Sequence, residues 1–341
     1  MSVSVSTRRR VGRTSLELPV FGFGAAHIGE LYTKVDEAES RATLDAAWDA
    51  GVRYYDTAPW YGRGLSEHRL GGFLRTKPRS EFLVTSKVGR TLHRPKDPKT
   101  FDRGPWLGGL NFEVQFDYSY DGIMRSFEDS LQRLGMSSVD ILYVHDLGAG
   151  THGVEGNKPY WEQFTTGGYR AVRELRNSGA VKAVGLGVNE WQVIMEAFAI
   201  GDWDVFLLAG RYTLLEQTAL EPMLSTCVAR GASVVVGGPF NSGILVGGST
   251  FNYTKAPEDI VQRVKAIEAV CQQFDVPLPA AALQFPLHHP AVCNVLPGPR
   301  SPEELDGILA WWDVKIPDAL WTTLAEKGLL APGTPIPGGT A

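Results

Sequence analysis

Short runs of consecutive apolar residues alternate along the chain with longer stretches in which apolar residues recur every three or four positions. Eight of the short runs are rich in β-branched and aromatic residues. Because neighbouring positions within each run are apolar, the runs are typical of parallel strands that are covered on both faces. These runs span residues 20–23, 52–55, 82–85, 141–144, 183–186, 205–208, 234–236 and 292–296.

The longer stretches between these runs have helical spacing. In 37–50 alanines recur every four residues, and in 119–134 large apolar residues form one stripe. Eight strands that alternate with helices predict a single closed (β/α)8 TIM barrel rather than an open doubly wound sheet. The first strand-to-helix turn, 22–27, also lacks the G-x-G-x-x-G pattern of a dinucleotide-binding fold.

Sequence before the first barrel strand predicts a β-hairpin, because apolar Val11 and the segment 16–18 flank a turn at 12–15. We expect this N-terminal β-hairpin to plug the bottom of the barrel. The chain is interpreted as one domain, 1–341, with a core at about 11–325. The tail 331–341 is rich in Pro and Gly and is expected to pack loosely.

Two connections are longer than barrel closure requires. One spans 89–118 after the third strand, and the other spans 237–255 after the seventh strand. Both are βα loops at the carboxyl ends of strands, where barrel enzymes build their active sites.

Composition narrows the class of protein. The chain has 341 residues, 43% of them hydrophobic and 21% charged, which is typical of a folded globular protein. Its net charge of -5 argues against nucleic acid as the main partner. No apolar run is long enough to cross a membrane, and residues 1–7 lack the apolar segment of a secretion signal.

The positions of the cysteines and histidines argue against disulfide bonds and metal sites. The three cysteines, Cys227, Cys271 and Cys293, are far apart and form no C-x-x-C motif, so we expect a reducing, cytoplasmic location without disulfides or zinc. The adjacent His288 and His289 have no evident partner, so no metal site is expected. The sequence does not decide the oligomeric state, and a homo-oligomer is compatible with it.

Four residues suited to proton transfer follow the second, third and fourth strands. They are Asp56, Tyr61, Lys87 and His145. Because the carboxyl ends of barrel strands share one rim, we expect these side chains to converge. A tyrosine has a pKa of about 10, and a lysine ammonium nearby favours its phenolate. Such a group suits proton transfer coupled to hydride transfer at a carbonyl or alcohol carbon.

These four residues resemble the catalytic tetrad of the aldo-keto reductase superfamily. Supporting segments are Asp-Thr-Ala-Pro-Trp-Tyr-Gly at 56–62, Thr-Ser-Lys-Val at 85–88, 139–145 and Leu-Pro-Gly at 296–298. Further segments, 116–122, 185–191 and 238–245, resemble the aldose 1-dehydrogenase branch, which includes L-fucose, D-threo-aldose and L-galactose dehydrogenases and pyridoxal 4-dehydrogenase.

The resemblance implies an oxidoreductase that oxidises a cyclic hemiacetal, an aldose at C1 or pyridoxal, to a lactone. In that reaction Tyr61 is the general base, Lys87 lowers its pKa, Asp56 is the counter-ion of the lysine, and His145 orients the substrate. The second interpretation is a broad-specificity NADPH-dependent aldehyde or ketone reductase. A third is a cofactor-binding regulatory subunit with vestigial activity.

The same resemblance implies a nicotinamide cofactor, with NAD expected and NADP as the alternative. Acidic Glu303 and Glu304 beside Arg300 disfavour an added phosphate. The residue that stacks on nicotinamide in the family is replaced here by a glycine, Gly237 or Gly238. The implied cofactor-binding residues are Asn189, Gly238, Pro239, Phe240, Asn241, Ser242, Gly243, Leu245, Gly298, Arg300 and Glu304.

A small-molecule substrate needs a pocket beside the tetrad. Trp60, Trp106 and Tyr118 are candidates because aromatic faces pack against sugar C–H groups, although loop packing explains them equally well. Asp146 follows His145 and either contacts substrate hydroxyls or fixes the imidazole. The roles of Arg211 and Tyr212 stay open at this point.

Overall fold

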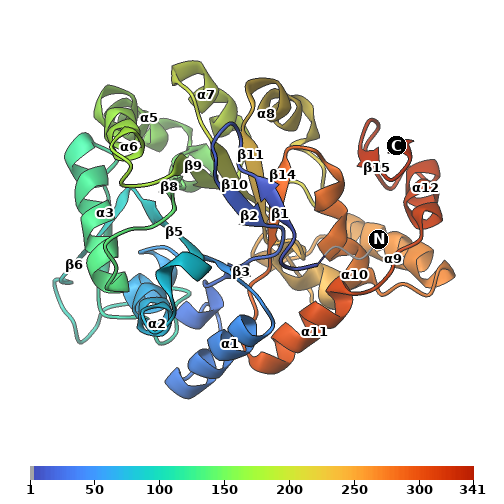
Figure 1. Ribbon diagram of the computed structural model, residues 1–341, viewed down its shortest axis with the longest axis horizontal. Coiled ribbons are helices and arrows are strands. Elements are labelled where there is room, and N and C mark those ends of the chain that lie inside the picture. The colour runs from blue at the N-terminus through green and yellow to red at the C-terminus, as the bar shows by residue number, and fades with distance from the viewer. Residues whose placement is uncertain (1–3) are drawn as a thin grey trace.

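The eight apolar runs form one parallel sheet in the computed structural model, which describes residues 4–341 (Figure 1). Residues 1–3, which fall within the expected domain, lie outside the described residues. Neighbouring strands follow the order β14-β11-β10-β9-β8-β5-β4-β3. Their bounds are β3 (Phe23–Gly24), β4 (Tyr54–Asp56), β5 (Leu83–Val88), β8 (Ile141–His145), β9 (Ala183–Val188), β10 (Val205–Ala209), β11 (Ser233–Gly237) and β14 (Val292–Leu296).

Backbone hydrogen bonds join the first and last strands and close the sheet. The Val295 N–H donates to Val20 O at 2.8 Å, and the Gly22 N–H donates to Val295 O at 3.0 Å. One residue pair further, Gly24 N–H donates to Pro297 O at 2.8 Å. The predicted (β/α)8 TIM barrel is confirmed.

Helices surround the barrel, and local capping explains where two of the predicted ones begin. The Asp36 side chain accepts a hydrogen bond from the Glu39 N–H, and Ser119 accepts from the Gly122 N–H. No helix within residues 4–341 is both long and apolar enough to cross a bilayer. The helices are α1 (Glu37–Asp49), α2 (Leu65–Leu74), α3 (Tyr120–Leu134), α4 (Ala149–His152), α5 (Val154–Gln163), α6 (Tyr169–Asn177), α7 (Gln192–Ile200), α8 (Ser225–Arg230), α9 (Glu258–Gln273), α10 (Leu278–Gln284), α11 (Pro302–Trp312) and α12 (Asp318–Glu326).

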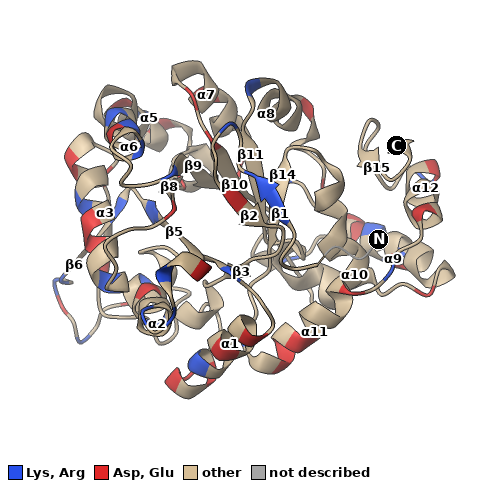
Figure 2. Cartoon of the chain, viewed as in Figure 1, with Lys and Arg blue, Asp and Glu red and all other residues tan. Residues whose placement is uncertain are grey.

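Acidic and basic residues are mixed along outer helices such as α1 and α3 (Figure 2). Mixed charge of this kind gives no concentrated basic surface on these helices, in agreement with the negative net charge.

The N-terminal segment forms the expected hairpin from β1 (Arg8–Arg10) and β2 (Glu17–Pro19). Val11, Leu16 and Leu18 are buried in a cluster with residues of seven barrel strands. The hairpin therefore plugs one end of the barrel, and the opposite end is left for the strand-end loops.

Both long loops contain short hairpins. Within 89–118, β6 (Arg90–His93) pairs with β7 (Glu113–Phe116), and within 237–255, β12 (Thr250–Phe251) pairs with β13 (Thr254–Lys255). The second loop also holds a 3₁₀ helix, η6 (Asn241–Val246).

The C-terminal tail is more ordered than its Pro and Gly content predicts. Strands β15 (Pro335–Ile336) and β16 (Gly339–Thr340) form a hairpin, and the Ala341 N–H donates to Thr334 O at 2.8 Å. The Thr334 side chain is buried. Hydrogen bonds within the hairpin give this segment local order, while residues 338–340 stay exposed.

Candidate active site

A buried ion pair lies at the carboxyl end of two adjacent strands. Asp56 ends β4, and Lys87 lies on β5; the parallel register aligns Asp56 with Thr85. Lys87 Nζ lies 2.6 Å from Asp56 Oδ2 and donates to the backbone carbonyl of Thr57 at 2.9 Å. Thr85 Oγ1 donates to the other carboxylate oxygen at 2.7 Å. Each charge thus has a partner, which offsets the large cost of burying it.

Tyr61 reaches this pair from η2 (Tyr61–Gly64), the turn that follows β4. Gly62 has a φ of 63°, and a Cβ there would lie 2.6 Å from the Gly29 carbonyl oxygen. Only glycine fits both constraints, so the two loops approach closely and fix the tyrosine. The Tyr61 ring centroid lies 4.5 Å from Lys87 Nζ and 5.8 Å from the His145 ring.

His145 ends β8 on the other side of Tyr61, with the two rings packed edge to face. Its Nε2 lies 3.6 Å from Asp146 Oδ2, and its Nδ1 has no hydrogen-bond partner within residues 4–341. Burial, followed by the positive charges of Arg90 and Lys87, holds the pKa of His145 well below its usual range. The imidazole is therefore neutral near pH 7, and one of its nitrogens can donate a hydrogen bond.

The pKa of Tyr61 is raised well above its usual value of 10.0. Burial is the largest cause, and the negative charges of Asp56 and Asp146 act in the same direction, whereas Arg90 lowers it. The sequence led us to expect that Lys87 lowers this pKa. Asp56 offsets part of the ammonium charge of Lys87, and burial outweighs the remainder. Tyr61 is consequently a protonated phenol, a form that donates a proton.

The three aromatic residues expected to line the substrate pocket occupy different positions in the structure. Trp106 is buried, and its ring centroid lies 5.5 Å from that of Trp60 and 5.8 Å from that of Tyr61, so these rings form one aromatic wall. Tyr118 is fully buried, and its hydroxyl donates to the His145 carbonyl at 2.7 Å.

The placement of Tyr118 corrects the expectation that it contacts substrate. A Cβ on Gly89 would lie 2.4 Å from the Tyr118 ring, so the ring packs directly against that glycine. No face of the ring is exposed. Tyr118 therefore stabilises the end of β8 through its hydrogen bond to the His145 carbonyl.

Asp146 does not point freely into a pocket, because Arg90 binds it. Arg90 Nη2 lies 2.7 Å from Asp146 Oδ2, and both side chains are largely buried. Arg90 went unnoticed in the sequence. The sequence feature that could have revealed it is its position three residues after Lys87 and two residues after the end of β5.

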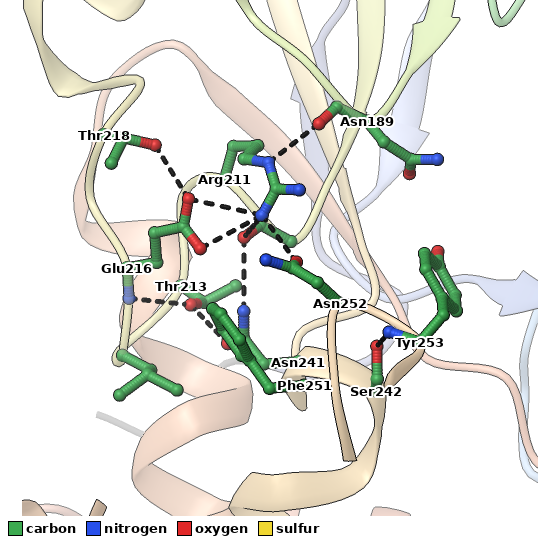
Figure 3. A network of polar contacts seen from close by, with 12 residues as sticks. Asn189, Arg211, Thr213, Glu216, Thr218, Asn241, Ser242, Phe251, Asn252 and Tyr253 are labelled. Atoms are coloured by element: carbon green, nitrogen blue, oxygen red, sulfur yellow. Dashed lines mark hydrogen bonds and ion pairs between the residues drawn. The ribbon is translucent and has the colours of Figure 1, made fainter. Parts of the chain in front are cut away.

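Asn189 follows β9 and is exposed at the rim. Its backbone carbonyl accepts a hydrogen bond from Arg211 Nε at 2.7 Å (Figure 3). Its side-chain amide has no hydrogen-bond partner in the part of the chain that the structure describes, and so remains able to pair with an amide group of a ligand.

The expected cofactor residues after β11 fall into two groups. Pro239, Asn241 and Leu245 are buried, and Asn241 accepts from Thr213 Oγ1 and donates to the Gly210 carbonyl at 3.2 Å. These residues shape the loop. The residues with exposed or partly exposed surface are Gly238, Phe240, Ser242 and Gly243.

Arg211, whose role the sequence left open, fixes this loop to the rim. Its Nη1 binds Asn252 Oδ1 at 2.7 Å and Glu216 Oε2 at 3.1 Å (Figure 3). Asn252 lies in the turn between β12 and β13, and the next residue, Tyr253, donates its N–H to Ser242 Oγ at 3.1 Å. A single guanidinium therefore joins the loops that follow β9, β10 and β11.

The start of α11 brings Gly298, Arg300 and Glu304 together. A Cβ on Gly298 would lie 2.9 Å from His27 Nδ1, so this turn needs glycine. Arg300 Nε donates to Glu304 Oε1 at 2.7 Å, and the Arg300 N–H donates to Glu304 Oε2 at 2.9 Å. This pairing holds the pKa of Glu304 below its usual value and neutralises the guanidinium charge.

The fold and this rim define an oxidoreductase barrel, and comparison with known proteins identifies the family. The aldo/keto reductase family model matches residues 20–328, and the chain belongs to that family. Enzymes of this family use nicotinamide cofactors. The exposed Asn189 amide fits such a group.

Individual relatives are similar along almost the whole chain. A pyridoxal 4-dehydrogenase of Microbacterium luteolum is 45% identical, covering 97% of this chain and 100% of the relative. A D-threo-aldose 1-dehydrogenase of a Pseudomonas species is 38% identical, covering 95% and 98%. An aldo-keto reductase structure from Bacillus halodurans has a TM-score of 0.72 at 23% identity, covering 96% and 97%, and supports the fold.

The raised pKa of Tyr61 predicts that this phenol stays protonated at pH 10, where a free tyrosine is half ionised. We expect the ultraviolet difference spectrum between the wild type and Tyr61→Phe to show no tyrosinate absorbance up to pH 10. A tyrosinate signal that belongs to Tyr61 at or below pH 10 would contradict this prediction.

Proposed function

We propose that this enzyme oxidises a cyclic hemiacetal, either an aldose at C1 or pyridoxal, to a lactone with NAD. The likeness to pyridoxal 4-dehydrogenase and D-threo-aldose 1-dehydrogenase supports this substrate class. One observation carries the chemistry, namely the Lys87–Asp56 pair held at 2.6 Å beside the Tyr61 ring, with His145 on the other side.

Tyr61 exchanges the hydroxyl proton of the substrate. In the oxidising direction the Tyr61 phenol first releases its proton to solvent. The phenolate so formed then accepts the hydroxyl proton of the substrate, while the hydride leaves the hemiacetal carbon with its electron pair. A bound nicotinamide would supply the hydride acceptor. Lys87 stabilises the phenolate, Asp56 keeps the lysine charged, and neutral His145 donates a hydrogen bond to the substrate oxygen.

The pairing at the start of α11 supports the proposed preference for NAD. The guanidinium of Arg300 is bound by Glu304 through two of its nitrogens and the adjacent N–H. A 2′-phosphate would have to displace this carboxylate and would lie beside its negative charge. The NAD ribose carries no such phosphate and meets no such cost.

A second candidate function is a broad-specificity NADPH-dependent aldehyde or ketone reductase. The protonated state of Tyr61 favours it, because carbonyl reduction requires a proton donor at the substrate oxygen. The substrate and cofactor measurements below separate the two functions.

We also propose that residues 1–341 act as one barrel domain in the cytoplasm, with a small-molecule substrate as partner. The family match across 20–328 and the three cysteines, none in a disulfide, support this assignment.

Cofactor reduction should be measured with L-fucose, L-galactose, D-arabinose and pyridoxal, using NAD and NADP. We expect turnover of at least one hemiacetal with NAD and formation of its lactone. Reduction of simple aldehydes with NADPH together with failure to oxidise all four compounds would instead establish the second function.

Lys87→Met removes the cation beside Tyr61. We expect kcat to fall by about 10²–10⁴, because the phenolate loses its stabilising charge. Nucleotide binding, followed by tryptophan fluorescence, should change little. The double variant Asp56→Asn/Lys87→Met removes both charges and avoids an unpaired buried carboxylate. Near-normal kcat in both variants would refute the role of Lys87.

Glu304→Gln frees the Arg300 guanidinium. We expect the preference for NADP relative to NAD to increase by about tenfold in kcat/KM, the effect of one charge-assisted contact. Glu303→Gln is the matched control, since no hydrogen bond or ion pair joins this neighbour to Arg300 within residues 4–341. Equal ratios in the two variants would argue against this account of cofactor choice.

A further inference from the structure

A second buried ion pair lies at the same end of the barrel as the Lys87–Asp56 pair. Arg90 follows β5 and Asp146 follows β8, and these neighbouring strands bring the two side chains to 2.7 Å. Asp146 Oδ2 is also 3.6 Å from His145 Nε2. The pair therefore adjoins the tetrad, although the chemistry described above does not use it.

Most of the Arg90 guanidinium has no partner. The side chain is 5% exposed, yet its Nε and Nη1 make no hydrogen bond within residues 4–341. Buried donors of this kind are rare because they lose hydrogen bonds to water without replacement. Two aromatic rings pack against the guanidinium. Its Cζ atom lies 5.5 Å from the centroid of the Trp60 ring and 4.8 Å from the centroid of the Phe116 ring.

A cavity of about 320 Å³ adjoins Arg90. A second guanidinium, that of Arg63, also lines it, but donates to the backbone carbonyls of Phe112 and Arg103 and is thus committed to the loop. Arg90 has two unused donors. The lining residues are Trp60, Arg63, Arg90, Phe101, Glu113, Val114 and Phe116.

We infer that Arg90 and Asp146 form the substrate-recognition pair, which binds a hydroxyl group close to the reacting carbon. This inference rests on the proposed oxidation of hemiacetals. A hydroxyl can accept a hydrogen bond from Arg90 and donate one to Asp146, so an arginine–carboxylate pair satisfies both of its roles. Trp60 and Phe116 flank the guanidinium and offer apolar surface to the substrate ring.

The two candidate substrate types share such a hydroxyl. An aldose carries one on C2, next to the reacting carbon. Pyridoxal carries one on the ring carbon beside the one that bears the aldehyde. The pair therefore predicts selection of hydroxylated hemiacetals over analogues that lack this oxygen.

The experiment compares each substrate with its deoxy analogue, L-fucose with 2-deoxy-L-fucose and pyridoxal with 3-deoxypyridoxal. For a substrate that the wild type oxidises, we expect kcat/KM to fall about 10–100-fold when the hydroxyl is absent. Arg90→Met should lose a similar factor with the hydroxylated substrate and discriminate less than threefold between the two compounds.

Arg90→Lys is a second variant, which keeps the positive charge but lacks the two unpaired guanidinium N–H groups. It should also lose most of the discrimination. A merely structural Arg90 would lower kcat/KM equally for both compounds and leave their ratio unchanged. Nucleotide affinity from tryptophan fluorescence, similar in all variants, verifies that they are folded.

A matched control lies at the opposite end of the same strands. Arg79 precedes β5 and binds Asp140, which precedes β8, at 2.9 Å; Lys182 also binds Asp140 at 2.8 Å. Arg79→Met therefore removes an arginine from an equivalent pair at the other end of these strands. This variant should keep the wild-type ratio of kcat/KM between the hydroxylated substrate and its deoxy analogue.

The outcomes separate the inference from the proposed function. If the wild type oxidises none of these hemiacetals, the proposed function is overturned and the inference falls with it. If the wild type oxidises them but does not discriminate against the deoxy analogues, or if Arg90→Met retains the discrimination, the inference alone is overturned.

Discussion

The site is organised around the ion pair between Lys87 and Asp56. Taking two charges out of water costs several kcal/mol per ion, and the cost is offset only where geometry and extra hydrogen bonds are good. Here the pair is 2.6 Å long, and Thr85 and the Thr57 carbonyl complete its hydrogen bonds. Adjacent barrel strands supply the rigidity that keeps these partners aligned, and Tyr61 is placed against them by a close contact between two glycines.

Hydrogen bonds from arginine side chains fix the loops that surround the Lys87–Asp56 pair. Arg63 binds backbone carbonyls in the loop after β5, and Arg211 joins the loops after β9, β10 and β11 (Figure 3). Because a guanidinium has five donors in a planar fork, it can satisfy several loop carbonyls at once. Arg90 differs from both, since two of its buried donors have no hydrogen-bond partner within residues 4–341.

Charge at the rim is largely paired. Lys87 with Asp56, Arg90 with Asp146 and Arg300 with Glu304 are three such pairs. Burial, together with the negative charges of Asp56 and Asp146, explains why Tyr61 keeps its proton. Burial and the positive charges of Arg90 and Lys87 account for neutral His145. The guanidinium of Arg300 is committed to Glu304.

The sequence alone determined the barrel, its N-terminal plug and the position of the tetrad. Strands buried on both faces must be apolar throughout, and residues directly after such strands must share one rim, so local patterns suffice. Tertiary structure decided what depends on distant partners: Tyr118 is buried against Gly89, Arg90 meets Asp146, and the tail forms a hairpin. Burial and the pairing of charges also set the pKa of Tyr61, and neither can be read from neighbours in the chain.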